Sequence, residues 1–293
     1  MNKGLIWMLH SVEDDSPRTA HCEIFRNLTV SPACLERKIR DARRDGWTFV
    51  SGERFLADKH DAHAHRNILI TIDDGFRNVY TEAFPLFRRL NVPFVFYLAT
   101  GLVEKGFRIC PYAQLDGMML LVDTALAQGK DPDRCFRRYR RLKRYFPFLD
   151  GRTVMRLIFG SGLDFEGYFR RSVVTSAEVR EMAESGLCEI GSHTVRHVHV
   201  DRIRSVAREL VESKAKIEAW TGRPCRTFSY PYGHFSPKAL ALVRRHFDWA
   251  TRDIRQPPFA VTDASDDHLL PRQIITRQKE IYQWCAKQAW LNL

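Results

Sequence analysis

A strand that ends in two adjacent carboxylates constrains this chain more than any other feature. Residues Leu69–Ile72 are apolar or β-branched, and Asp73, Asp74 and Gly75 follow them directly. Such a run is typical of a buried strand, and a glycine allows the sharp turn after it. A helical pattern over 79–90 and a second apolar run over 92–99 come next. Strand, helix and strand at this spacing predict a βαβ unit with parallel strands.

Other short apolar runs predict more strands of the same kind. These runs lie at 5–9, 188–193, 227–230, 248–251 and 269–275, with an edge strand at 47–50. Helical patterns cover 32–46, 177–185, 206–220 and 237–246. The expected N-caps are Ser31, Thr175 or Ser176, and Asp201. We therefore predict an α/β fold whose parallel strands close into a (β/α) barrel, with the strand ends gathered at one face.

The ends of the predicted strands carry residues that can do chemistry. In chain order these residues are His10, Asp73 with Asp74, Ala99, His193, Tyr232, Thr251 and Arg272. Two neighbouring carboxylates repel each other, which is tolerable if one binds a metal and the other acts as a base. Asp74, His193 and His197 would form a two-histidine, one-carboxylate set that suits Zn²⁺ and leaves positions for water and substrate. Zinc would acidify a water and polarise a carbonyl, and Asp73 could take the proton.

Each motif also has an ordinary structural explanation when it is taken alone. Asp-Asp-Gly fits a turn that caps a helix, Tyr-Pro-Tyr-Gly fits a plain turn, and histidines four residues apart occur on many surfaces. His60, His63 and His65 cluster in a charged loop, but no apolar framework fixes them, so we expect no metal site there. The order of the three strand-end motifs along the chain is what favours a catalytic site.

Three motifs resemble those of the polysaccharide deacetylases, which are carbohydrate esterase family four with the NodB-homology domain. They are Thr71–Gly75, Ser192–His197 and Phe228–Gly233, and the resemblance covers about 5–101 and 172–276. It implies a distorted (β/α) barrel and metal-dependent hydrolysis of N-acetyl groups on amino sugars.

The resemblance also implies roles, carried over residue by residue. Asp73 would be the general base, the metal ligands would be Asp74, His193 and His197, and the backbone N–H of Tyr232 would stabilise the oxyanion together with the metal. We also expect substrate contacts from Tyr230, Pro231 and Trp249.

The sequence departs from the family pattern at two positions, and another residue must fill each of the two roles. Ser229 stands where the third motif usually carries an Arg that orients the base, and Arg272 is our candidate substitute. The family's acid is normally a late histidine, but His268 precedes a strand, at the wrong end of a barrel. His10 resembles the opening of a subgroup that includes poly-N-acetylglucosamine deacetylases, and we predict it as the acid. A surface arginine and a structural histidine are the alternatives.

We expect one catalytic domain over 1–293, with a basic helical insertion at about 102–171 and a C-terminal helical tail at about 277–293. One face of the insertion carries Cys135, Tyr139, Leu142 and Phe146, and the opposite face carries Arg134, Arg137, Arg138, Arg141 and Arg144. It is either a lid for an anionic or membrane-linked substrate or a solvated face. The tail, with Trp284 and Trp290, either contacts a bilayer interface or packs on the barrel or a partner subunit.

Composition limits the partners and the cellular location that we expect for the protein. The formal net charge of +11 favours acidic partners. Nucleic acid is not expected, since no zinc finger, helix-turn-helix or aromatic RNA-binding strand occurs. Seven cysteines without a Cys-x-x-Cys pair fit reduced thiols. The first residues hold too short an apolar run for a secretory signal, so we expect a cytoplasmic protein that can touch the inner face of the membrane.

The predicted activity is release of acetate from an N-acetylated amino sugar. The substrate would belong to a bacterial-type polysaccharide, an oligosaccharide or a lipid-linked glycan precursor. One alternative is a C–N hydrolase acting on a small non-sugar amide, and another is a non-catalytic binder of anionic glycan or nucleic acid. The ligand set also accepts cobalt, nickel or iron. The sugar, the linkage, the acyl group and the oligomeric state are left open by the sequence.

Overall fold

The computed structural model describes residues 4–14, 28–61, 66–105, 172–254 and 259–275, together with Asp131, Arg134 and Arg137. Almost all of the predicted insertion, and the whole of the predicted tail, therefore lie outside the described residues. Within these described ranges, no helix combines the length and the apolar character needed to cross a membrane.

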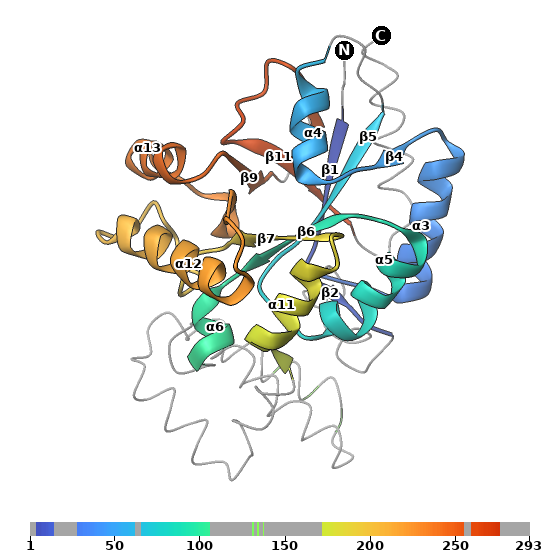
Figure 1. Ribbon diagram of the computed structural model, residues 1–293, viewed down its shortest axis with the longest axis horizontal. Coiled ribbons are helices and arrows are strands. Elements are labelled where there is room, and N and C mark those ends of the chain that lie inside the picture. Colours follow the sequence, from blue (N-terminus) through green and yellow to red (C-terminus); the bar gives the residue numbers. More distant parts are fainter. Residues whose placement is uncertain are drawn as a thin grey trace.

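Seven parallel strands close into a ring at the centre of the molecule (Figure 1). In order around the ring they are β1 (Gly4–Leu9), β5 (Asn67–Ile72), β6 (Phe94–Leu98), β7 (Cys188–Ser192), β8 (Thr227–Tyr230), β9 (Trp249–Asp253) and β11 (Leu270–Ile274). Strand β11 then pairs with β1, which closes the ring. The predicted distorted (β/α) barrel is confirmed.

Short strands extend this ring at its margins. Strand β4 (Thr48–Phe49) runs parallel to β5, and β10 (Ala260–Val261) runs antiparallel to β1. Strands β2 (Ser11–Val12) and β3 (Thr29–Val30) form a separate parallel pair. The edge strand predicted at 47–50 therefore exists, whereas β2, β3 and β10 are too short to be read from an apolar pattern.

Helices surround the ring, as Figure 1 shows. They are α3 (Pro32–Arg44), α4 (Gly52–Lys59), the π-helical turn η1 (Val79–Ala83) leading into α5 (Phe84–Leu90), α6 (Thr100–Lys105), α11 (Ser176–Glu184), α12 (Val206–Thr221) and α13 (Pro237–His246). Ser31 and Thr175 cap α3 and α11 as expected. The cap predicted at Asp201 is wrong, because α12 begins only at Val206 with Ser205 before it.

The two faces of each strand bury different partners. Inward-facing residues such as Leu69, Val95 and Tyr97 form a small cluster inside the barrel, whereas Ile70 and Phe96 face the surrounding helices. Both faces are therefore covered, which explains why the strands read as nearly continuous apolar runs.

Strand register sets where the polar residues meet. Strand β1 pairs with β5 from Gly4↔Asn67 to Leu9↔Ile72, and β6 pairs with β7 up to Leu98↔Ser192. These neighbouring strands therefore end level with one another. The residues that follow them are delivered to one edge of the barrel.

Candidate functional site

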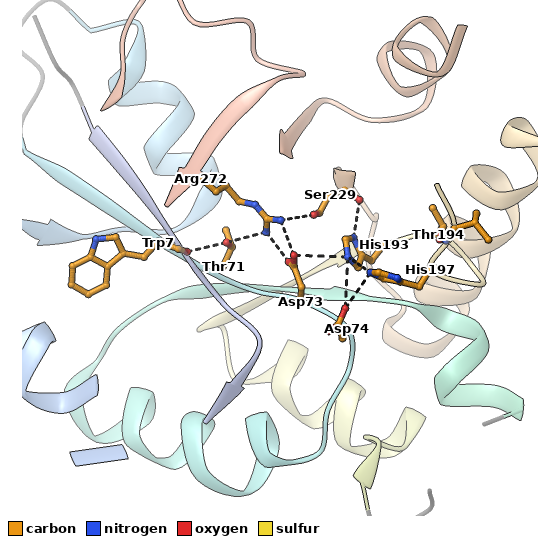
Figure 2. A network of polar contacts seen from close by, with 10 residues as sticks. Trp7, Thr71, Asp73, Asp74, His193, Thr194, His197, Ser229 and Arg272 are labelled. Carbon is orange, nitrogen blue, oxygen red and sulfur yellow. Dashed lines mark hydrogen bonds and ion pairs between the residues drawn. The ribbon is translucent and has the colours of Figure 1, made fainter. Parts of the chain in front are cut away.

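Three buried donor atoms converge at the carboxyl ends of the strands (Figure 2). His193 Nε2 lies 3.1 Å from His197 Nε2 and 3.8 Å from Asp74 Oδ1, and His197 Nε2 lies 3.4 Å from the same Oδ1. Tetrahedral zinc with bonds of about 2.0–2.1 Å places neighbouring donors about 3.3 Å apart. Two imidazole nitrogens and one carboxylate oxygen in this arrangement fit a divalent transition metal.

His193 is held in the tautomer that a metal ligand needs. Its Nδ1–H donates a hydrogen bond to the backbone carbonyl of Ser229 at 2.8 Å, which leaves Nε2 unprotonated and facing the other donors. Burial lowers the pKa of His193 to about 4, against the opposing charge of Asp73. Burial, reinforced by His193, also holds the pKa of His197 well below its usual value. Both histidines are therefore neutral at neutral pH, as metal ligation requires.

The loop between the two histidines is strained and is clamped by Glu209. Thr194 and His197 have φ values of 67° and 50°, in the left-handed region that L-residues seldom adopt. Glu209 of α12 is 4% exposed, and its Oε2 accepts the backbone N–H groups of Val195 and Arg196, each at 3.0 Å. Glu209 was not predicted from the sequence, where its one signal is an acidic residue one turn after Val206 in an apolar helical pattern.

Asp73 forms a buried, two-pronged ion pair with Arg272 (Figure 2). The two guanidinium nitrogens donate to the two carboxylate oxygens at 2.7 and 2.6 Å, and the Arg272 guanidinium also donates to the hydroxyls of Ser229 and Thr71. Burial would raise the pKa of Asp73, but the guanidinium outweighs burial and the net pKa is lowered. Asp73 is therefore ionised and fixed in orientation.

The structure thus brings the proposed substitute arginine to the base, although from a different position than expected. Arg272 is the third residue of the five-residue strand β11, not its tip. Its side chain points into the barrel and reaches across to β5. The hydroxyl of Ser229, which stands in the family's arginine position, serves as one of its hydrogen-bond acceptors at 2.9 Å.

The two candidate acids lie at opposite ends of the barrel. His10 directly follows β1, and its surroundings include the charges of Asp73, Arg272 and Asp253; burial is the largest influence and lowers its pKa. His268 precedes β11, and its Nε2 lies 3.0 Å from the carbonyl of Phe247, which precedes β9. The structure therefore groups His10, and not His268, with the carboxylates. Asp253 was missed because the predicted strand ended at Thr251, two residues too early.

Tyr232 lies at the site, but two of the predicted substrate contacts do not. Its ring packs edge-on against His197 with centroids 4.7 Å apart, and the neighbouring Pro231 is buried. Tyr230 is wholly buried and packs against Phe228 in the outer core. Trp249 is the first residue of β9, at the amino end of the barrel. The expected substrate contacts of Tyr230 and Trp249 are therefore corrected: one residue faces the helices and the other lies at the wrong end of its strand.

Solved structures of three bacterial proteins share this fold. IcaB from Ammonifex degensii is 16% identical with a TM-score of 0.63, and the match covers 100% of this chain and 98% of that one. A de-N-acetylase from Aggregatibacter actinomycetemcomitans is 16% identical with a TM-score of 0.65, over 97% of this chain and 98% of that one. The Streptococcus pyogenes deacetylase PplD, in complex with acetate, is 16% identical with a TM-score of 0.64, over 94% of this chain and 92% of that one. At such low identity the likeness establishes the fold alone. No curated protein matches the chain.

A closed parallel barrel with a buried Asp-His-His set at its carboxyl edge is suited to metal-dependent hydrolysis. Residues 60–246, which are well over half of the sequence, match the family model for polysaccharide deacetylase. The chain belongs to the polysaccharide deacetylase family, whose reaction is metal-dependent removal of N-acetyl groups from glycans.

Proposed function

We propose that this protein removes the N-acetyl group from an amino sugar of a polysaccharide, an oligosaccharide or a lipid-linked glycan precursor, using zinc or a similar divalent metal. One observation carries the proposal: the donor atoms of Asp74, His193 and His197 converge beside a second, ionised carboxylate that an arginine holds in place. A divalent metal bound by those three donors would polarise the acyl carbonyl and acidify water.

The proton transfers fall to residues of the chain itself. Asp73 takes a proton from the attacking water, and Arg272 keeps its carboxylate ionised and correctly turned. The backbone N–H of Tyr232 donates to the oxygen that becomes negative at the carbonyl carbon. His10 takes up the proton that Asp73 removed from the water and passes it to the nitrogen as the C–N bond breaks. The products are acetate and a free amine.

The substrate assignment rests on three kinds of support. The family acts on glycans, and one structural neighbour is named a de-N-acetylase and another is a deacetylase with acetate bound. Tyr232, whose ring packs against His197, is 41% exposed, so the site borders solvent on that side. The net charge of +11 favours a glycan that is anionic or linked to an anionic lipid. The cytoplasmic location and the contact with a membrane surface stay predictions.

An acetate-release assay tests the proposal. Protein loaded with Zn²⁺ or Co²⁺ is incubated with N-acetylglucosamine oligomers, with a lipid-linked N-acetylated sugar and with a small non-sugar acetamide. We expect acetate from at least one N-acetylated sugar and its loss on chelation. Release from the small amide alone would support the C–N hydrolase alternative. A folded, metal-loaded protein that releases acetate from none of them would contradict the proposal.

A further inference from the structure

A row of aromatic rings extends outward from the metal ligand His197. The ring of His199 lies flat on the ring of Tyr232, with centroids 4.0 Å apart and planes only 9° from parallel. Tyr232 in turn packs edge-on against His197, at 4.7 Å and 73°. His199 therefore reaches the metal site through one intermediate ring. None of the three motifs includes His199, and among the described residues the clustered donor set holds only Asp74, His193 and His197.

Tyr232 is a residue that needs support from its neighbours. Its φ of 61° is left-handed, which is costly for a residue with a side chain. The residue is 41% exposed, so the protein core holds it only in part. The adjoining Gly233 shows how tightly the same turn is packed, since a Cβ there would clash with the backbone carbonyl of Asp253. A flat ring stacked on Tyr232 restricts both its side chain and its backbone.

We propose that His199 is a positioning residue for the proposed deacetylation. Its stacked ring fixes the orientation of Tyr232, and Tyr232 then does two things. It presents its backbone N–H to the oxyanion, and it limits the tilt of the His197 imidazole that binds the metal. His199 touches neither the reacting atoms nor the metal, so its effect passes entirely through Tyr232. This inference rests on the proposed function.

Three variants separate the stacking role from a merely structural one. His199→Ala removes the ring, and His199→Phe keeps a flat ring without the imidazole nitrogens. The matched control is His234→Ala, because His234 is exposed and contacts His199, with centroids 5.4 Å apart. Circular dichroism and thermal unfolding confirm that each variant is folded.

Two readouts are measured on the metal-loaded, full-length protein. For acetate release, we expect His199→Ala to lower kcat by about 10- to 100-fold, less than the loss of a whole oxyanion donor, with little change in KM. We expect His199→Phe to recover most of that loss and His234→Ala to behave as the wild type. For Co²⁺ binding, followed by visible absorption, we expect His199→Ala to weaken affinity by about 10-fold and to shift the spectrum.

The outcomes that would overturn the inference are distinct from those that concern the activity. Wild-type kcat and Co²⁺ affinity in His199→Ala would overturn it. So would a His199→Phe variant as impaired as His199→Ala, because the imidazole nitrogens and not the stack would then matter. If the wild-type protein released no acetate, the proposed function would fail, whereas the Co²⁺ measurements would still decide whether His199 orients the metal site.

Discussion

The two ends of the barrel differ in backbone conformation and in the contacts of their side chains. Among the described residues, five that are not glycine have positive φ, and four of them lie at the carboxyl end: Asp74, Thr194, His197 and Tyr232. The fifth, Asn91, ends helix α5 just before β6 begins, on the amino side of the barrel. At the amino end, Phe55 of α4 packs against Gly4 of β1, and Lys59 pairs with Asp267 at 2.5 Å.

This difference shows which end of the barrel carries backbone strain and which end contributes more to stability. Each left-handed residue with a side chain costs about 1–3 kcal/mol and persists because its surroundings hold it. The carboxyl end accepts such costs around the donor atoms of the site, whereas the amino end holds the apolar cluster inside the barrel and the ion pair of Lys59 with Asp267. Substitutions at the carboxyl end should therefore reduce activity more than stability, and substitutions at the amino end should do the reverse.

The largest effect is expected at the carboxyl end, from Asp73→Asn. The amide cannot take a proton from water, so acetate release should fall by about 10²- to 10⁴-fold, while metal content stays close to that of the wild type. The unfolding temperature should also fall, because the amide leaves the buried Arg272 guanidinium without its charged partner. The matched control is Asp58→Asn, a buried carboxylate at the amino end that accepts from Asn67 at 2.6 Å. That variant should lose stability and keep its kcat. Full turnover in Asp73→Asn would show that the base is another group.

The amino end should respond to Phe55→Ala mainly in stability. This ring is 3% exposed and belongs to the cluster inside the barrel. Its removal leaves a cavity and should lower the free energy of unfolding by about 3–5 kcal/mol, as measured by urea denaturation. The kcat of the folded fraction should not change. A large fall in kcat at unchanged stability would mean that the two ends are not independent.

Glu189 makes the stability of the amino end depend on pH. It lines a cavity of about 550 Å³ with Glu53 and Trp249. Burial, with Glu53, raises its pKa from 4.5 to about 7. The folded protein then binds more protons than the unfolded chain between these values, so stability falls as pH rises from about 4.5 past 7, by up to about 3 kcal/mol.

The test compares Glu189→Gln with Glu184→Gln, which changes an exposed residue of α11. Urea midpoints are measured at pH 5 and pH 8. The Glu189 variant should lose less stability over this interval than the wild type, and the Glu184 variant should follow the wild type. Equal pH slopes in all three proteins would rule out a raised pKa at Glu189.

The smallest effect is expected from Glu209, which holds the loop between His193 and His197. Glu209→Gln replaces a carboxylate that holds the N–H groups of Val195 and Arg196 and the side chain of Arg196. Looser positioning of the two histidines should weaken Zn²⁺ binding by about 10- to 100-fold in calorimetric titrations. The control is Glu212→Gln, a partly exposed residue of α12 whose carboxylate pairs with Arg208 and Lys216 and does not contact the loop. An unchanged zinc affinity in Glu209→Gln would show that the strained loop needs no clamp.

The site residues at the carboxyl end could be predicted from the sequence where they belong to short motifs. The strands were recognisable because both of their faces are buried. Asp73, Asp74 and His193 follow strands directly, and His197 lies in the same loop as His193. The contacts of Arg272 could not be derived, because a side chain in the middle of a strand reaches Asp73 only through the register of a closed ring. Trp249 and Tyr230 were misplaced for a similar reason. Trp249 lies at the amino end of the barrel because β9 starts there, and Tyr230 faces the helices because of the direction in which its side chain leaves β8.

Metal binding by the wild type and by a ligand variant is the most direct test of the account. Protein treated with chelator and then dialysed against Zn²⁺ should hold about one ion per chain by elemental analysis, and His197→Ala should hold far less while keeping the circular dichroism of the barrel. Acetate release should follow the metal content. If the wild type bound no zinc, cobalt or nickel, or if His197→Ala bound as much as the wild type, the convergence of Asp74, His193 and His197 would not be a metal site and the account would be wrong.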